Sequence, residues 1–351
     1  MRPKYFPYFQ PIIDLNSGKI AGYEALARTN KNGHIASAGH IFNDPLLNQQ
    51  QQLIIDRSIR KQALKMIASY PESGFLTINI SPGWIDKLDH RDKIPTIEMI
   101  QEIGIPPNRI IIEITELAGS ITNLKHITTQ YQKHGIRVAI DDFGAGYSQL
   151  NRVAELEPEL IKIDMGLLKE ASLGGVKGDI LLSLSGLAKR TGSQIICEGI
   201  ETEHEFHFAI ECGADFIQGW IFYPAMETPL DSKSTINKTI ALKQSYLSRK
   251  RSRTKNTVHQ NNLVSNHIEK IRKHIENITD HNYKLTTSDR ARMTEEGILR
   301  YYLCNEQADQ ISPNFELFNG NFIVSSPTPS ANWSHRPYFS LLYDIENLVD
   351  A

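Results

Sequence analysis

The segment Arg137–Asp142, with the sequence RVAIDD, is an apolar run that ends on two adjacent carboxylates. Four more short apolar runs also end on a residue that can bind a metal ion or move a proton: LTIN (Leu76–Asn79), IIIE (Ile110–Glu113), LIK (Leu160–Lys162) and QIICE (Gln194–Glu198). In a parallel β-barrel, alternate strand residues point inward and the chemistry lies at the carboxyl ends of the strands.

Counting back by two from each polar end reaches only small or apolar residues: Thr77, Ile111, Ala139, Leu160 and Ile196. One face of each run therefore carries a core residue followed by a ligand-type residue. The alternative is a set of solvated strand ends, and five runs in the same phase disfavour it.

Length and charge limit the class of protein. A chain of 351 residues is long enough for two domains, or for one barrel of roughly 250 residues with an appendage. The formal net charge of −2 gives no overall positive field for DNA or for an anionic membrane. A nucleotide substrate remains compatible with this charge, because a pocket that holds bound cations needs no basic surface.

Cysteine usage and hydropathy suggest a cytoplasmic protein. The three cysteines, Cys197, Cys212 and Cys304, are too few and too irregular for a disulfide framework or a zinc motif. No apolar stretch of about 20 residues predicts a membrane span. The first residues, MRPKYFPYFQPI, lack the features of a signal peptide.

Strands and helices alternate through most of the chain. Tyr8–Asp14 and Lys19–Arg28 resemble strands, and Asn16-Ser17-Gly18 between them predicts a hairpin turn. From about residue 50 to 230, apolar strands alternate with amphipathic segments such as Asp56–Ala68. This alternation indicates βα units with a parallel sheet, closed or open.

The composition changes after residue 239. Residues 240–285 contain no convincing strand; they include a basic run, Ser248–Lys255, and an apolar helical seam from Val264 to Ile278. The basic run is read as a solvated helix face or linker, with a nucleic-acid or lipid contact as the alternative. Farther on, Ile298–Cys304 and Phe315–Val324 predict antiparallel strands of a small α+β module. We therefore expect a barrel over 1–239, a helical linker over 240–285 and a module over 286–351.

The densest segment for chemistry is AIDDFGAGYS, Ala139–Ser148. Adjacent carboxylates at a strand end repel each other unless a cation neutralises them. A pair of divalent cations about 4 Å apart, bridged by one aspartate, would satisfy Asp141 and Asp142. The alternative is an aspartate helix cap followed by a glycine turn.

The ligand type indicates the metal. Glu24, Asn79, Glu113 and Asp141 offer only oxygen donors, which favour Mg²⁺ or Mn²⁺ over Zn²⁺ or Cu²⁺. Lys162 is in phase with these carboxylates and is a candidate for positioning a metal-bound water. Its alternative role is a structural ion pair.

These residues resemble those of the EAL-domain phosphodiesterases, which hydrolyse cyclic di-GMP in bacterial second-messenger signalling. The tripeptide that gives the family its name is Glu24-Ala25-Leu26, and the resemblance covers about 225 residues. The other matching blocks, in order, are FQPI (Phe9–Ile12), NIS (Asn79–Ser81), EITE (Glu113–Glu116), DDFGAGYS (Asp141–Ser148), KID (Lys162–Asp164), EGIE (Glu198–Glu201) and QGW (Gln218–Trp220).

The resemblance implies two Mg²⁺ or Mn²⁺ ions and a role for each matched residue. The first ion would be bound by Glu24, Asn79, Glu113 and Asp141. Asp142 would bind the second ion, with Asp141 bridging and Glu198 as a further candidate ligand. Lys162 and Glu198 would orient and deprotonate the attacking water, and Glu116 would brace the Phe143–Ser148 loop. Positions that line the substrate are matched by Gln10, Leu26, Arg28, Asp164, Glu201, Gln218 and Pro224.

The C-terminal part resembles a PAS-like domain attached to a subgroup of EAL proteins. The matching segments are Arg300–Gln310 and Asn332–Phe339, and the second is similar to the ligand-binding loop of Cache-type sensors. Trp333, Arg336 and Tyr338 are candidate contacts to an unknown small ligand, with a packing role as the alternative. The family's domain continues past this loop whereas the chain ends at Ala351, so we expect a truncated module.

The sequence therefore predicts an α/β protein with a TIM-like (β/α) barrel that contains one antiparallel strand, followed by a helical linker and the PAS-like module. The predicted reaction is metal-dependent hydrolysis of cyclic di-GMP to linear pGpG, and we also expect a homodimer. The first alternative is a cyclic di-GMP receptor that signals through its C-terminal module without turnover. Another metal hydrolase on the same fold is a third reading, because fold alone does not specify substrate.

Overall fold

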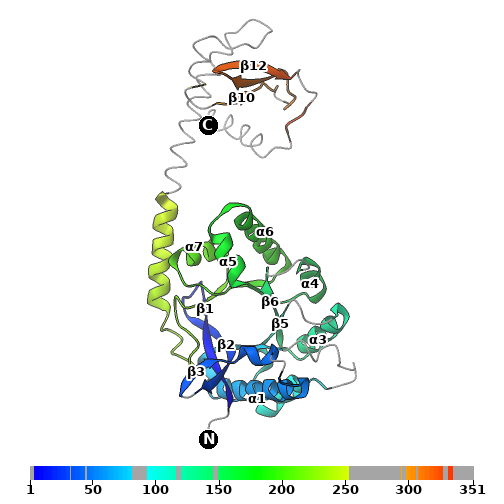
Figure 1. The fold of residues 1–351 in the computed structure, drawn as a ribbon, viewed down its shortest axis with the longest axis vertical. Coiled ribbons are helices and arrows are strands. Elements are labelled where there is room, and N and C mark those ends of the chain that lie inside the picture. The colour runs from blue at the N-terminus through cyan, green and yellow to red at the C-terminus, as the bar shows by residue number, and fades with distance from the viewer. Residues whose placement is uncertain are drawn as a thin grey trace, which may run out of the picture. The chain divides into compact units, whose positions relative to one another are not determined.

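Eight strands close into a barrel in the computed structural model (Figure 1). Strand β1 (Tyr5–Asp14) lies antiparallel to both of its neighbours, β2 (Ile20–Lys31) and β9 (Phe216–Gln218). The remaining neighbours pair in parallel, in the order β2, β4 (Phe75–Asn79), β5 (Ile110–Thr115), β6 (Arg137–Phe143), β7 (Leu160–Ile163), β8 (Gln194–Cys197) and β9. The prediction of a TIM-like barrel with one antiparallel strand is confirmed.

The structure describes residues 4–31, 33–43, 46–80, 93–115, 120–144, 149–252, 294, 298–305, 307–326 and 331–334. The Val264–Ile278 seam, Glu116, Arg336 and Tyr338 lie outside these residues. Among the described helices, none combines the length and the apolar composition needed to span a bilayer.

Helices surround the barrel and connect its strands (Figure 1). They are α1 (Gln49–Ala68), α2 (Pro95–Ile103), α3 (Ile121–Lys133), α4 (Gln149–Leu156), α5 (Met165–Ser172), α6 (Gly175–Thr191), α7 (Glu203–Glu211) and a helix over residues 236–252. Strand β3 (His34–Ser37) and the 3₁₀ turns Gly39–Asn43, Pro71–Ser73 and Pro107–Arg109 complete this part. Local signals set the ends: Thr202 and Glu205 form a capping box at the start of α7, and Gly104 ends α2 in a left-handed conformation.

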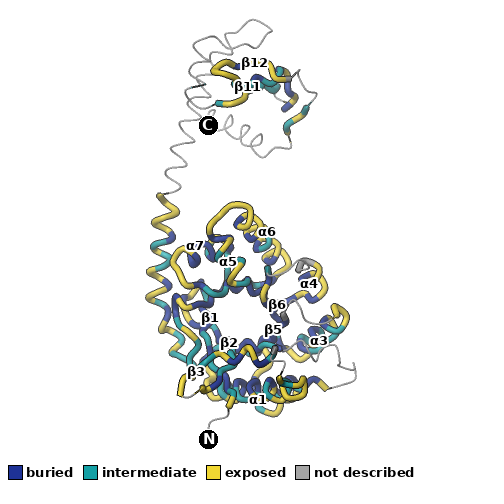
Figure 2. Tube along the Cα trace, viewed as in Figure 1, coloured by how far each residue is buried: buried dark blue, intermediate teal, exposed yellow. Residues whose placement is uncertain are grey.

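The predicted inward phase of the strands is confirmed. Ile111, Ala139, Leu160 and Ile196 are fully buried in one cluster, and Thr77 is equally buried. Intervening strand residues such as Ile112 and Val138 face the helices and join a second, larger apolar core. Figure 2 shows the result, with buried strands inside and exposed residues on the outer faces of the helices. Each strand thus has one row of side chains that leads along the barrel interior.

The chain divides into two compact units, Met1–Lys250 and Arg251–Ala351. In the second unit, β10 (Arg300–Tyr301), β11 (Asn314–Phe318) and β12 (Asn321–Ser326) form an antiparallel sheet. Reading Phe315–Val324 as one strand was wrong. Asn319 and Gly320 have φ of 47° and 75° and turn the chain into a hairpin, because this dipeptide readily adopts left-handed backbone conformations.

Candidate active site

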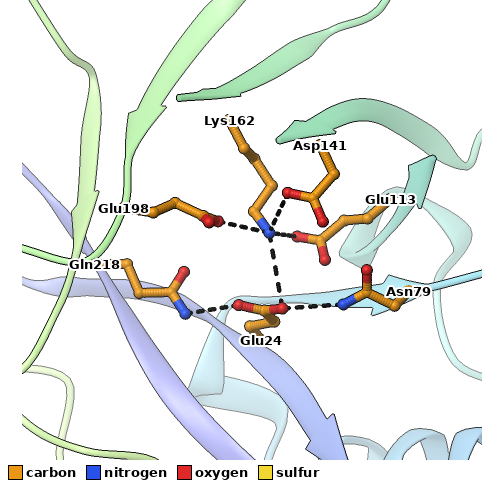
Figure 3. Close-up of polar contacts among 7 residues, drawn as sticks. All are labelled: Glu24, Asn79, Glu113, Asp141, Lys162, Glu198 and Gln218. Atoms are coloured by element: carbon orange, nitrogen blue, oxygen red, sulfur yellow. Dashed lines mark hydrogen bonds and ion pairs between the residues drawn. The ribbon is translucent and has the colours of Figure 1, made fainter. Parts of the chain in front are cut away.

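A cluster of polar side chains lies at the carboxyl ends of the barrel strands (Figure 3). Its members come from successive strands: Glu24 on β2, where the pairing with β4 ends, Asn79 on β4, Glu113 on β5, Asp141 on β6, Lys162 on β7, Glu198 just after β8 and Gln218 on β9. The period-2 alternation that fills the barrel interior with apolar residues also delivers these groups to one place.

The Lys162 ammonium lies at the centre of this cluster (Figure 3). Its Nζ is 2.6 Å from Glu198 Oε1, 2.7 Å from Glu113 Oε1 and 3.0 Å from Asp141 Oδ1. Glu24 Oε1 is farther away, at 3.7 Å. One buried lysine therefore pairs with carboxylates from four different strands.

Two amides hold the Glu24 carboxylate in place. Asn79 Nδ2 donates to Glu24 Oε1 at 2.9 Å, and Gln218 Nε2 donates to Glu24 Oε2 at 2.7 Å. Gln218 is itself buried, and its Oε1 has no hydrogen-bond partner in the described ranges. The carbonyl oxygen of this amide can therefore accept a hydrogen bond from a ligand or a water.

The protonation states of the cluster are coupled through Lys162. Burial alone would lower the pKa of Lys162, but the surrounding carboxylates, Asp141 first, raise it well above its usual value. Burial raises the pKa of Glu113 strongly, against the attraction of Lys162. Burial likewise raises the pKa of Glu198 to about 8, with Lys162 opposing and Asp141 reinforcing the shift. The lysine stays charged while the carboxylates compete for one counter-charge.

A β-bulge brings two adjacent aspartates to the same site. The pairing of β6 with β7 shifts register between Ile140 and Phe143, and Asp142 adopts a φ of 54°. In a regular strand, Asp141 and Asp142 would point to opposite faces. Here one carboxylate oxygen from each of Asp141, Asp142 and Glu198 lies within 4.8 Å of the others. Desolvation, followed by repulsion from Asp141, raises the pKa of Asp142.

The donor set fits divalent cations. Glu113 is fully buried, yet its Oε2 has neither a hydrogen bond nor an ion pair among the residues that the structure describes, which is costly for a carboxylate without a cation. Five carboxylates (Glu24, Glu113, Asp141, Asp142 and Glu198) share one ammonium, and two divalent ions would neutralise the remainder. All of these donors are oxygens, the ligands that Mg²⁺ and Mn²⁺ favour.

Several other predicted site residues lie on the elements around this cluster. Gln10 on β1 is directly paired with Glu24, and Leu26 and Arg28 follow on the same strand as Glu24. Arg28 is half-buried, and this burial lowers its pKa while Glu24 opposes the shift. All three residues lie on β1 or β2, the strands that carry Glu24 and its antiparallel partner.

The remaining predicted contacts lie on loops at the same end of the barrel. Asp164 caps helix α5, with its Oδ1 accepting from Leu167 N at 2.8 Å. Exposed Glu201 pairs with Lys169 of α5 at 3.1 Å, and Pro224 is exposed after β9. The sequence analysis did not predict a role for Lys169, whose one signal was its position just over a turn after the Asp164 cap.

In the second unit, the described contacts of Trp333 are internal. Its indole N–H donates to Gln310 Oε1 at 3.1 Å, and its ring lies 5.5 Å from that of Tyr302. These contacts favour the packing alternative for Trp333, while its role towards a small ligand stays a prediction.

Comparison with known proteins identifies the family. A sequence profile of the EAL domain matches residues 2–225. This chain belongs to the EAL-domain family. A second profile, that of an EAL-domain associated signalling protein domain, matches residues 232–350. The resemblance read from the sequence is thereby confirmed for both parts.

Two curated EAL-domain relatives illustrate the range of similarity. The uncharacterized EAL-domain containing protein YkuI of Bacillus subtilis (strain 168) is 27% identical over 351 residues, which cover 98% of this chain and 84% of the relative. The probable cyclic di-GMP phosphodiesterase PdeI of Escherichia coli (strain K12) is 30% identical over 230 residues, which cover 63% of this chain and 29% of PdeI. The second match spans less than a third of its relative.

Solved EAL-domain structures share this fold. The crystal structure of B. subtilis YkuI, in complex with substrate c-di-GMP and calcium, matches with a TM-score of 0.85 and 26% identity over 98% of this chain and 86% of that chain. A c-di-GMP-bound standalone EAL protein from Vibrio cholerae O395 matches with a TM-score of 0.58 and 27% identity over 68% of this chain and 99% of that chain.

Proposed function

We propose that this EAL-domain protein is a metal-dependent phosphodiesterase that hydrolyses cyclic di-GMP to linear pGpG. The observation that carries the proposal is the buried all-oxygen cluster with an unpartnered Glu113 oxygen and a surplus of negative charge. The names of the relatives support the substrate: YkuI was crystallised with c-di-GMP, and PdeI is called a probable cyclic di-GMP phosphodiesterase.

The cation-binding role falls to the oxygen donors at the strand ends. Glu24, Asn79, Glu113 and Asp141 would hold one Mg²⁺ or Mn²⁺ ion; Asp141 and Asp142 would hold a second, with Glu198 as a further ligand. Such ions lower the pKa of bound water and stabilise charge on the leaving oxygen of a phosphodiester. The amides of Asn79 and Gln218 hold Glu24 for this role.

Lys162 and Glu198 would handle the attacking water. The carboxylate of Glu198 would take up the proton of that water. Lys162, 2.6 Å from Glu198, keeps that carboxylate oriented towards the cluster. Lys162 pairs with the proposed metal ligands Glu113 and Asp141, and a carboxylate oxygen of Glu198 lies within 4.8 Å of those of Asp141 and Asp142.

Substrate recognition would use the rim of the barrel. The Arg28 guanidinium suits a phosphate oxygen, because it can form two parallel hydrogen bonds to it. The unpartnered Gln218 Oε1 can accept a hydrogen bond from a base or ribose donor. The other predicted contacts are Gln10, Leu26, Asp164, Glu201 and Pro224.

The decisive experiment is a turnover assay of the full-length protein with cyclic di-GMP and either Mg²⁺ or Mn²⁺, read by chromatography of pGpG. Turnover that chelation abolishes supports the enzyme. Binding of cyclic di-GMP without turnover supports the receptor, the main alternative. Neither binding nor turnover would leave another phosphodiester as the substrate.

The C-terminal module and a homodimer complete the proposal. We assign to the module a regulatory role with an unidentified small ligand, as its EAL-associated signalling profile supports. A homodimer would account for three exposed apolar residues: Leu173, which caps the end of α5, and Val176 and Ile180 on α6, where the exposed fractions are 83%, 74% and 50%. Sedimentation velocity of the wild type and of Val176→Glu/Ile180→Glu tests this assembly.

A further inference from the structure

The helix over residues 236–252 is docked on the barrel although it leads along the chain to the second unit. Just before it, Thr235 Oγ1 donates to Gly18 O at 2.7 Å. Within it, Lys243 Nζ donates to Leu15 O, and the ring of Tyr246, which is buried, lies 5.5 Å from that of His207 on α7. The barrel unit therefore extends to Lys250 and includes most of this helix.

Two polar contacts join this helix to the first turn of α7. The Ser245 hydroxyl donates to Glu203 Oε1, and Arg249 Nη1 is 3.2 Å from His204 Nδ1. Glu203 and His204 are the first two residues of α7. The helix therefore contacts α7 at the end nearer the active site.

His204 also connects α7 to α5. Its Nε2 is 2.7 Å from the carbonyl oxygen of Ser172, the last residue of α5. A carbonyl oxygen only accepts, so Nε2 carries the proton, and in the neutral ring Nδ1 then accepts from the Arg249 guanidinium. The imidazole thus links three helices through one defined tautomer.

The same two helices, α5 and α7, hold the loop after β8. The Glu201 backbone N–H donates to Glu205 Oε2 of α7 at 2.8 Å, while the Glu201 side chain pairs with Lys169 of α5 at 3.1 Å. Glu198, the proposed base, lies three residues before Glu201. Movement of the first turn of α7 therefore changes the position of this loop.

We propose that Ser245 and Arg249 form a latch through which the helix over residues 236–252 sets the position of the Glu198–Thr202 loop and thereby the turnover of the barrel. Arg249 and His204 act as positioning residues. Their hydrogen bonds to each other and to Ser172 join helices, and do not reach the proposed metal ligands or substrate contacts. The inference rests on the proposed function, and it assigns the route by which the C-terminal part regulates the active site.

The test is hydrogen exchange of residues 198–205, combined with kcat and KM, in full-length Ser245→Ala/Arg249→Ala. We expect exchange in this segment to rise and kcat to fall by about 2- to 30-fold, the range typical of coupling residues remote from a ligand. Arg249→Lys keeps a donor for His204 Nδ1 and should recover most of the loss when Ser245 is present. Arg251→Ala, which removes the same charge from the same helix, is the control and should leave both readouts unchanged.

The outcomes separate this inference from the proposed function. Unchanged exchange at 198–205 in the double variant overturns the latch, whatever the activity. An equal loss in Arg251→Ala also overturns it, because the effect would then follow from charge alone. If the wild type shows no turnover, the proposed function fails, yet a rise in exchange at 198–205 with weakened Mn²⁺ binding still supports the latch.

Discussion

Glu113 shows how one buried side chain can favour function over stability. Its carboxylate is fully enclosed, and one of its oxygens lacks a partner within the described part of the chain, so a metal-free protein carries the cost of desolvating it. Lys162 at 2.7 Å offsets part of this cost but is shared with Asp141 and Glu198. Such a residue is explained by the cation that we propose it binds.

Glu113→Gln should therefore separate metal binding from stability. Without metal, we expect an unchanged or higher Tm at neutral pH, because burial raises the pKa of the Glu113 carboxyl, which must take up a proton on folding, whereas the amide need not. With Mn²⁺, we expect binding and the metal-induced rise in Tm to be lost. Calorimetry with and without Mn²⁺ measures both. Glu102→Gln, at an exposed carboxylate paired with Lys61, is the control. A Mn²⁺ affinity equal to that of the wild type in Glu113→Gln would remove this residue from the ligand set.

Glu198→Gln tests the proposed base. A neutral amide cannot take a proton from water, so we expect kcat to fall by about 10²–10⁴-fold while cyclic di-GMP still binds. Turnover assays and equilibrium binding of cyclic di-GMP measure the two effects separately. Loss of binding together with the rate would show that Glu198 acts chiefly as a metal ligand or a structural group.

The raised carboxylate pKa values predict how the metal-free protein responds to pH. Above the ordinary pKa of about 4.5, the unfolded chain has lost protons that folded Glu113 and Glu198 still hold, so stability falls as pH rises through the folded pKa, about 8 for Glu198. Lys162 remains charged across this window and contributes no slope. We expect the Tm in EDTA to be lower at pH 8 than at pH 6, with a smaller drop in Glu198→Gln. A Tm that rises over this interval would contradict the assigned shifts.

Among the elements, the turn after β6 determines where both aspartates lie. Gly144 has a φ of +114°, and an added Cβ would come within 2.0 Å of the Leu167 side chain on α5. Gly144 directly follows β6 and lies two residues after Asp142, so we expect strain here to act on both carboxylates of the bulge.

Gly144→Ala should lower activity far more than stability alone explains. Misplacement of a catalytic group by about 1 Å can cost on the order of 100-fold in rate, and we expect a loss of that order with weaker Mn²⁺ binding. Gly192→Ala is the matched control: it also has a positive φ, +81°, but has no atom within 4 Å of the added Cβ. Similar kinetic losses in both variants would show that general destabilisation is responsible.

At the scale of the whole molecule, the helix over residues 236–252 determines where the chain can be shortened without loss of barrel stability. A chain ending at Thr239 lacks the contacts of Lys243 and Tyr246, whereas a chain ending at Lys250 keeps them. We expect the 1–250 chain to fold, to bind Mn²⁺ and to hydrolyse cyclic di-GMP with a changed rate. The 1–239 chain should unfold at a lower temperature. Thermal scans and turnover assays check this; a folded but inert 1–250 chain would assign the second unit a role in the active state.

The sequence by itself determined the inward faces of the strands and most of the polar cluster. Strand periodicity left the sheet closed or open, and the family resemblance predicted the barrel. Strand periodicity is a local property, so counting by two placed Glu113, Asp141 and Lys162 on the inward faces, and parallel strands necessarily bring their ends together. The hairpin at Asn16-Ser17-Gly18 was equally readable. By contrast, the Asn319-Gly320 turn had a local signal that was overlooked.

Only the tertiary structure decided contacts between residues that no local rule relates. The bulge that turns Asp141 and Asp142 to one site depends on pairing between β6 and β7. The pairing of Lys169 with Glu201, and the link from His204 to Arg249, depend on how separate helices pack. The sequence thus specified which groups face the barrel interior, whereas packing of distant segments fixed their partners, distances and protonation.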